Sequence, residues 1–148
     1  MTLWDAAMAG DVAALTAALD ADPATMNEPG PGGWPALHLA SHFGHLECVD
    51  LLLARGADVS LRSANELQNL ATHAAAAGRI PGRRAPILER LLDAGIPVDA
   101  TQHGGFTALH SACQNEDEAS IQLLLARGGD IDKAAGDGRT PAALRKGR

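Results

Sequence analysis

The sequence predicts an all-α protein built from repeated helix pairs. The first observation is an internal copy, because the stretch from Gly33 to Asp58 recurs from Gly105 to Asp130 with matching apolar and glycine positions. The second is composition: hydrophobic residues make up 46% of the 148 residues, aromatic residues make up 3%, and tyrosine is absent. A core of Leu, Ala, Val and Ile suits closely stacked helices better than a β-sandwich, which draws on aromatic and β-branched residues.

Residues 1–30 are expected to form a first repeat that caps one end of the stack. Leu3 opens a short helix that ends at Gly10, and a second helix follows in which apolar residues recur every three to four positions. These apolar residues are Val12, Leu15, Ala18 and Leu19. A loop rich in glycine and proline then runs from Asn27 to Gly33.

The second repeat, residues 31–63, carries the pattern most completely. It contains Gly33-Trp34-Pro35-Ala36-Leu37-His38-Leu39-Ala40, a Gly44-His45 turn, and Leu51-Leu52-Leu53-Ala54-Arg55-Gly56-Ala57-Asp58. This resembles the ankyrin repeat, with its Thr-Pro-Leu-His-x-Ala-Ala, Gly-His turn and Leu-Leu-x-x-Gly-Ala-Asp, and the resemblance covers almost the whole chain. The resemblance implies a solenoid of stacked antiparallel helix pairs with β-hairpin-like finger loops. It also implies a scaffold that binds another macromolecule, an unidentified protein.

The third repeat, residues 64–101, departs from this pattern, and two registers fit it. Aligning Leu70 with Leu37 gives a 33-residue period but places His73 at a tightly packed alanine position. Aligning His73 with His38 keeps that position small and adds two residues to the finger. We prefer the second register, because a small residue where helices touch is harder to replace than a leucine.

An enlarged turn, residues 78–86, is expected inside the third repeat. Two prolines, Pro81 and Pro86, are expected to exclude a continuous helix until Ile87. Loops tolerate changes of length at little cost, so replacing the segment by a normal Gly-His turn is expected to leave the core intact. The segment carries three cations, Arg79, Arg83 and Arg84.

The fourth repeat spans residues 102–134, and a partial fifth repeat spans residues 135–148. Thr140-Pro141 starts a helix expected to stop after one or two turns, with a basic end that suits a helix C-terminus. Each helix pair is too short to be stable alone, so stability must come from stacking onto the neighbouring pairs. Residues 1–148 are therefore predicted to form a single domain.

Charge is distributed unevenly along the chain, whose net charge is −6. Residues 1–54 contain seven acidic residues and no Lys or Arg, whereas the remainder contains twelve basic and eleven acidic residues. A nucleic-acid footprint needs a continuous basic stripe, so this distribution argues against nucleic acid as the partner. It would allow steering of a charged protein partner. We expect a monomer. The alternative is self-association between the acidic and basic regions of two copies.

The N-terminal residues show no secretory signal pattern, and no apolar run reaches the length of a membrane span. Two cysteines, Cys48 and Cys113, are too few for a disulfide framework and lie inside helical patterns. These features predict a cytoplasmic protein that does not bind membranes.

Three histidines, His38, His73 and His110, occupy the Leu-His position of the repeat. The resemblance implies that each imidazole bonds backbone groups of the turn and fastens one repeat to the next. In the second repeat, Pro35 replaces the threonine that usually accompanies this histidine, so the hydrogen bond between them is not expected there.

Two patterns suggest chemistry and are better explained by the repeat. His38, His42 and His45 have the spacing of ligands on a helix, but the glutamate of a metalloprotease helix is missing and the Gly-His turn accounts for His45. Cys113 follows His110 by three residues, yet a nucleophile pair also needs a third orienting group. We expect no catalytic residue, no metal and no cofactor.

The resemblance implies that partner contacts come from the finger tips and the exposed side of the first helix of each pair. The residue just before the Thr-Pro position is Trp34, Asn69 (Leu67 in the other register), Phe106 and Arg139. The two residues before the Gly-His turn are His42-Phe43 and Gln114-Asn115, and His103 lies at the start of the fourth repeat. All of these are predicted to line one concave surface.

Trp34, Phe43 and Phe106 are three of the four aromatic residues in the chain, and the core does not need them. Aromatic side chains dominate interface energies, so three on one surface indicate a contact patch. The alternative is that the rings cover the finger roots and pack against neighbouring repeats.

Overall fold

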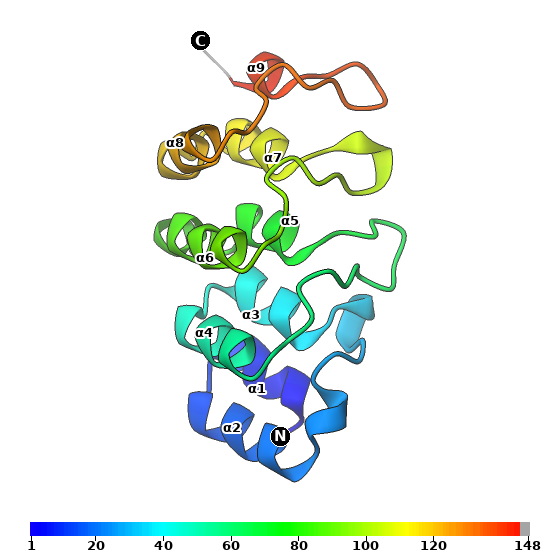
Figure 1. Ribbon diagram of the computed structural model, residues 1–148, viewed down its shortest axis with the longest axis vertical. Helices are drawn as coiled ribbons and strands as arrows, with labels where there is room; N and C mark the ends of the chain where they lie inside the picture. Colours follow the sequence, from blue (N-terminus) through cyan, green and yellow to red (C-terminus); the bar gives the residue numbers. More distant parts are fainter. Residues whose placement is uncertain (146–148) are drawn as a thin grey trace.

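A computed structural model describes residues 1–145, which contain helices and loops and no strand. Successive helix pairs stack along one axis from the N-terminal to the C-terminal end (Figure 1). The helices are α1 (Leu3–Ala9), α2 (Val12–Ala21), η1 (Pro23–Thr25), η2 (Pro31–Gly33), α3 (Ala36–Phe43), α4 (Leu46–Ala54), α5 (Ala71–Ala76), α6 (Pro81–Asp93), η3 (His103–Gly105), α7 (Ala108–Gln114), α8 (Glu118–Ala126) and α9 (Pro141–Leu144). The all-α prediction is confirmed, and no helix in this part of the chain is long and apolar enough to cross a membrane.

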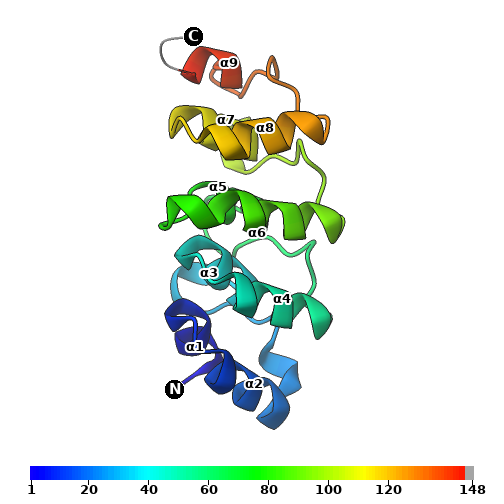
Figure 2. The same cartoon turned by 90° about the vertical axis from the view of Figure 1, so that its left-hand side faces the viewer.

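The stack has two helical layers and a row of finger loops. The inner helices α1, α3, α5, α7 and α9 pack on one another, and the outer helices α2, α4, α6 and α8 form the second layer (Figure 2). In Figure 1 each inner helix lies between its outer helix and the fingers. Small residues such as Ala40 and Ala75 let the inner helices approach closely, while Leu52 and Leu124 fill the space beneath the outer helices. One continuous core therefore runs through all the repeats.

The helix ends follow from local sequence. Thr2 caps α1 by accepting a hydrogen bond from the Asp5 backbone N–H, and Asp11 and Asp117 cap α2 and α8 in the same way. Gly56, placed by the sequence to stop the second helix of its pair, has a φ of +85°, which is the left-handed conformation glycine allows. The basic end was predicted at residues 145–148; Arg145 caps α9, and residues 146–148 lie outside the described residues.

The fingers are loops held together by backbone hydrogen bonds. Within each finger the residue before the N-cap of the inner helix accepts a backbone hydrogen bond from the opposite arm, at 2.8–2.9 Å. The donor–acceptor pairs are Gly30–Trp34, Ser63–Asn69, Gln102–Phe106 and Ala135–Arg139. Adjacent fingers are joined by one backbone hydrogen bond each, of 2.7 Å. The backbone N–H groups of Ala64, His103 and Gly136 donate to the carbonyls of Gly33, Leu67 and Gly104 in turn. A side chain at Gly33 would place its Cβ 2.2 Å from the Ala64 carbonyl oxygen, so this close approach requires glycine.

The prediction of an enlarged turn at residues 78–86 is wrong, because most of this segment is helical. Helix α6 begins at Pro81 and continues through Pro86, so only residues 77–80 connect it to α5. Pro81 occupies the first helical position, where a missing N–H costs nothing. Pro86 removes one hydrogen bond, and the burial of Ile87 and Leu88 just beyond it offsets that loss.

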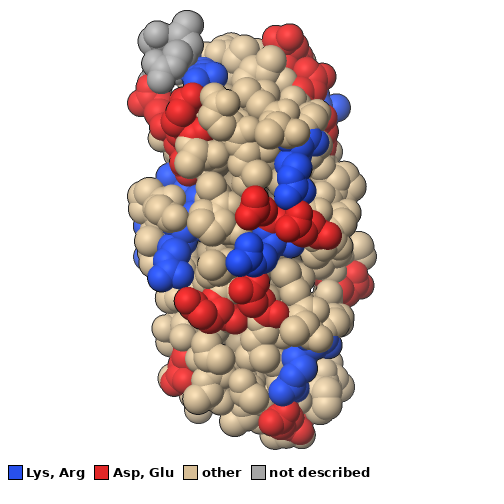
Figure 3. Space-filling view, turned by 60° about the vertical axis from the view of Figure 1, so that its left-hand side comes forward, with Lys and Arg blue, Asp and Glu red and all other residues tan. Residues whose placement is uncertain are grey.

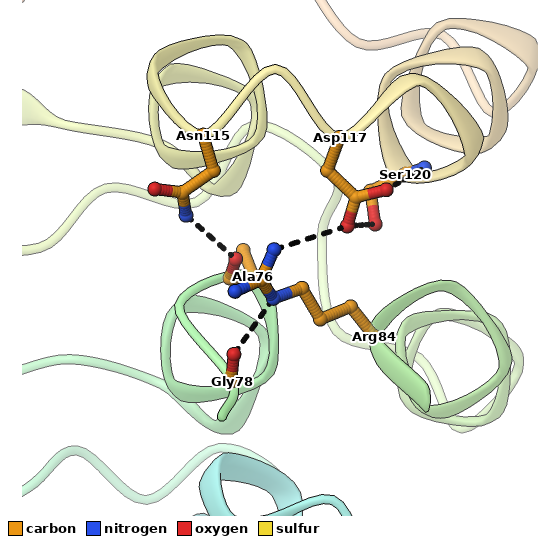
Figure 4. Close-up of polar contacts among 6 residues, drawn as sticks. All are labelled: Ala76, Gly78, Arg84, Asn115, Asp117 and Ser120. Atoms are coloured by element: carbon orange, nitrogen blue, oxygen red, sulfur yellow. Dashed lines mark hydrogen bonds and ion pairs between the residues drawn. The ribbon is translucent and has the colours of Figure 1, made fainter. Parts of the chain in front are cut away.

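Arg84 shows that the added part of α6 is integral to the stack. Its Nε donates a 2.7 Å hydrogen bond to the Gly78 carbonyl, and its guanidinium lies 3.7 Å from an Asp117 carboxylate oxygen (Figure 4). Asp117 also accepts a 2.8 Å bond from the Ser120 hydroxyl. The side chains of Arg84 and Asp117 are only 16% and 11% exposed, so this contact joins the third and fourth repeats away from solvent.

Arg84→Gln is expected to lower the free energy of unfolding by roughly 1–3 kcal/mol, because it removes a charged hydrogen bond and leaves Asp117 partly buried without its cation. A urea melt followed by circular dichroism measures the change. The matched control is Arg83→Gln, whose exposed pair with Glu47, at 3.6 Å, should contribute less than about 1 kcal/mol. Equal effects in the two variants would show that the Arg84 contact does not hold the repeats together.

Acid–arginine pairs join successive repeats on the side of the outer helices (Figure 3). The pairs are Asp20–Arg55, Glu47–Arg83, Asp50–Arg90, Asp93–Arg127 and Glu118–Arg145. In each pair the acid lies in one repeat and the arginine comes from the next. Some of the acidic residues of the first 54 positions therefore form ion pairs with arginines of the next repeat in the same chain.

Candidate functional site

Three rings form a continuous strip along the inner helix of the second repeat and the end of the finger that precedes it. The Trp34 and His42 ring centroids are 5.1 Å apart, and those of His42 and Phe43 are 5.4 Å apart, both with nearly perpendicular planes. This edge-to-face geometry is favourable for aromatic pairs. Trp34, at the end of its finger, and Phe43, at the end of α3, are both half-buried, so their rings remain partly accessible.

The strip continues onto the next repeat through Arg79 and Ile80. The Arg79 guanidinium lies over the Phe43 ring, 5.1 Å from its centroid, and the Arg79 backbone N–H donates to the His42 carbonyl at 2.8 Å. Ile80 packs on Gly44 and keeps 43% of its surface exposed. Sequence reasoning missed both residues because their contacts, with Phe43 and Gly44, cross from one repeat to the preceding one. The signal that marks them is the excess length of this repeat.

A second aromatic group lies two repeats further along. Phe106 packs edge-to-face on His110 with centroids 5.4 Å apart, and Arg139 lies over the Phe106 ring at 5.4 Å. Arg139 is also bound to Asp137, at 2.6 Å. Phe106 and Trp34 hold the same place before their helices, so stacked repeats put them on one side of the molecule.

The remaining predicted residues differ in accessibility. Gln114 and Asn115 are exposed at the end of α7, where Asn115 donates a 3.4 Å hydrogen bond to the Ala76 carbonyl. His103 is exposed on its finger tip. Asn69 is 3% exposed, with its N–H bound to the Ser63 hydroxyl, so its prediction as a surface contact is wrong. We call the accessible set Trp34, His42, Phe43, Arg79, Ile80, His103, Phe106, Gln114, Asn115 and Arg139 the inner surface.

The repeated histidines connect successive segments of the stack through hydrogen bonds. In each case Nε2 donates to a carbonyl about 30 residues further along the chain: His38 to Asn69 at 2.8 Å, His73 to Ala100, beside the start of the fourth repeat, at 2.9 Å, and His110 to Arg139 at 3.1 Å. His73 stands in α5 where His38 stands in α3, which confirms the preferred register of the third repeat.

In two of these histidines the other ring nitrogen, Nδ1, accepts a hydrogen bond from a backbone N–H at the start of its own helix. The Nδ1 of His73 accepts from the Leu70 N–H, and that of His110 accepts from the Thr107 N–H, both at 3.0 Å. The Nδ1 of His38 has no partner among the described residues, because Pro35 offers neither an N–H nor a hydroxyl. The hydrogen bond between His38 and the residue at position 35, which the sequence led us not to expect, is therefore absent among the described residues.

Burial lowers the pKa of His38, His42 and His73, and that of His73 falls to about 4. The unfolded imidazole takes a proton near its ordinary pKa of 6.5, so between these values the unfolded state binds more protons than the folded state. Stability should thus be full above about pH 6.5 and fall as the pH drops toward 4. Urea melts should show a loss of roughly 1–2 kcal/mol between about pH 7 and pH 5. An unchanged midpoint over that interval would contradict the buried, neutral state of His73.

The histidine and cysteine side chains whose spacing suggested a metal site or a nucleophile are hydrogen-bonded to the backbone or buried. His45 donates from Nε2 to the Met8 carbonyl at 2.8 Å, and the His42 Nδ1 bonds the Ala74 carbonyl at 3.3 Å. Burial raises the pKa of the Cys113 thiol, which disfavours the thiolate a nucleophile needs. Within residues 1–145 no three His, Cys, Asp or Glu side chains are gathered as a metal site.

A cavity of about 240 Å³ lies between the second and third repeats, apart from the inner surface. It is lined by Val59, Ser60, Arg62, Leu70, Gly95, Ile96, Pro97 and Ala100. The Arg62 guanidinium at its edge donates to the Gln68 and Thr101 carbonyls, at 2.8 and 2.6 Å. This guanidinium thereby ties two fingers together.

Residues 3–102 match the family model described as ankyrin repeats (3 copies), and residues 104–135 match the model described as ankyrin repeat. The NAD-capped RNA hydrolase NUDT12 of Homo sapiens, and those of Pongo abelii and Macaca fascicularis, are each 44% identical to this chain over 52 residues. That segment is 35% of this chain and 11% of each relative, so the chain spans about a tenth of their length. Ankyrin repeats are generally protein–protein interaction modules and are typically non-catalytic. With the family models covering most of a stack of helix pairs, the chain belongs to the ankyrin repeat family.

Proposed function

We propose that this chain is a non-enzymatic scaffold that binds a protein partner on its inner surface and acts as a monomer. The observation that carries the proposal is the strip of Trp34, His42 and Phe43, whose rings contact one another and remain partly accessible. Partly exposed aromatic residues supply most of the binding energy when a partner covers them. The cytoplasmic location predicted from the sequence remains part of this proposal.

The opposite face offers less to a partner. Its acidic residues Asp20, Glu47 and Asp50 already pair with arginines of the following repeat, so they leave little unpaired charge for a second copy of the chain. Exposed pairs of this kind contribute little energy individually. This pairing favours a partner on the inner surface over the self-association that the charge distribution had suggested.

Affinity isolation from cells that express the protein tests the proposal. Wild-type protein should retain a partner that the double variant Trp34→Ala/Phe106→Ala does not retain, while both remain folded by circular dichroism. A partner retained equally by both proteins would place the binding surface elsewhere.

A further inference from the structure

We propose that the inner surface recognises an acidic protein segment, with a partner carboxylate on Arg79 and the partner's adjacent apolar side chains against Trp34, Phe43 and Ile80. This inference rests on the proposed function and adds the chemistry of the partner. It follows from where Arg79 is held, from what it does not bind within its own chain, and from the residues around it.

Arg79 is held in place without being covered. Its guanidinium rests on the Phe43 ring and its backbone is bonded to His42, yet the residue is exposed. Stacking on an aromatic ring restricts the long side chain while leaving the edge of the guanidinium open. A guanidinium edge presents its N–H donors as a planar fork, which matches the two oxygens of a carboxylate.

Arg79 is also the unusual arginine of this chain. Its neighbours Arg83 and Arg84 pair with Glu47 and Asp117, and five further arginines, 55, 90, 127, 139 and 145, each form an ion pair. Arg62 has no carboxylate but donates to two carbonyls. Within residues 1–145, Arg79 alone among the arginines has a guanidinium bound to neither a carboxylate nor a carbonyl.

The surroundings of Arg79 are apolar and positive. Ile80, Phe43 and Trp34 supply accessible apolar surface, and no acidic side chain takes part in the strip. Burial, and then the charges of Arg79 and Arg84, lower the pKa of His42, because nearby cations oppose a further positive charge. A partner group that neutralises Arg79 beside this apolar surface is thus an acid flanked by apolar residues.

A nucleic acid fits these features poorly. Its phosphates repeat along the backbone and call for a series of unpaired cations on one face. Most cations of the described part already have acidic partners in the chain, and the net charge of the whole sequence is −6. One open arginine beside aromatic rings suits a single carboxylate of a polypeptide.

The test is to pan a displayed library of short random peptides against the full chain and to measure the selected peptides by fluorescence anisotropy. Wild-type protein should select peptides with Asp or Glu next to an aromatic or branched apolar residue. Arg79→Gln should lower the affinity for these peptides by roughly tenfold or more, and Arg79→Glu should abolish the preference for acidic residues. Arg83→Gln, in the first turn of α6 and paired with Glu47, is the matched control and should change affinity by less than about twofold.

The outcomes separate this inference from the proposed function. Peptides that lose binding in Trp34→Ala but show no acidic preference, or that bind Arg79→Glu as well as wild type, would overturn the inference and leave the scaffold proposal standing. A library that yields no peptide dependent on Trp34 would contradict both. Thermal melts of every variant establish that each one is folded, and the exposed position of Arg79 predicts little change.

Discussion

Leu52→Ala is expected to lower the free energy of unfolding by roughly 2–5 kcal/mol, the largest stability change predicted for this chain. Leu52 is completely buried in α4, which packs against α2 on one side and α6 on the other. Removing most of its side chain leaves a cavity where repeats meet, and surrounding helices close such a cavity only in part. Domains are stable by only about 5–15 kcal/mol, so this loss would be a large share of the total.

Urea unfolding of Leu52→Ala measures this change, with Leu67→Ala as the matched control. Leu67 is 44% exposed on a finger, and the same truncation there should change stability by no more than about 0.5 kcal/mol. A loss below about 1 kcal/mol for Leu52→Ala would show that α4 is not buried between its neighbours as described.

The repeat pattern allowed most of the fold to be predicted. Histidines at one position of successive repeats located the starts of α3, α5 and α7, and glycines such as Gly56 located the ends of outer helices. The histidines are reliable signals because each bonds a carbonyl further along the stack, and the glycines because each allows the left-handed conformation that ends a helix. The same logic anticipated that Pro35 would leave His38 without one of its hydrogen bonds.

Helix α6 could not be predicted because the rule for proline is local and the helix is stabilised from outside. Pro81 and Pro86 each remove a donor, which from sequence alone marks a loop. The deciding contacts are the burial of Ile87 and Leu88 and the reach of Arg84 to another repeat, which no local pattern reveals. Tertiary packing outweighed local preference here.

The inner surface was predicted in part for a similar reason. Trp34, Phe43 and Phe106 stand out because the repeat pattern does not call for aromatic residues there. Asn69 was placed beside them by its position in the repeat, but its longer finger turns it inward against Ser63. Arg79 was missed because its contact with Phe43 crosses from one repeat to the next.

Trp34→Ala and Phe106→Ala should each weaken partner binding by roughly 2 kcal/mol or more, about thirtyfold in affinity. Both rings are partly accessible in the free protein, so a partner that covers them gains their remaining apolar surface. Each ring also packs on a histidine of its own repeat, Trp34 on His42 and Phe106 on His110. Their truncation should therefore cost some stability, but less than Leu52→Ala.

The most direct measurement is the affinity of the isolated partner for these two variants by calorimetry, taken together with their urea midpoints. The inner-surface assignment predicts a binding loss of about thirtyfold in each variant and a stability loss well below that of Leu52→Ala. Intact binding together with a strongly lowered midpoint would contradict it. Trp34 and Phe106 would then be packing residues of the finger roots, and the partner would bind another face of the stack.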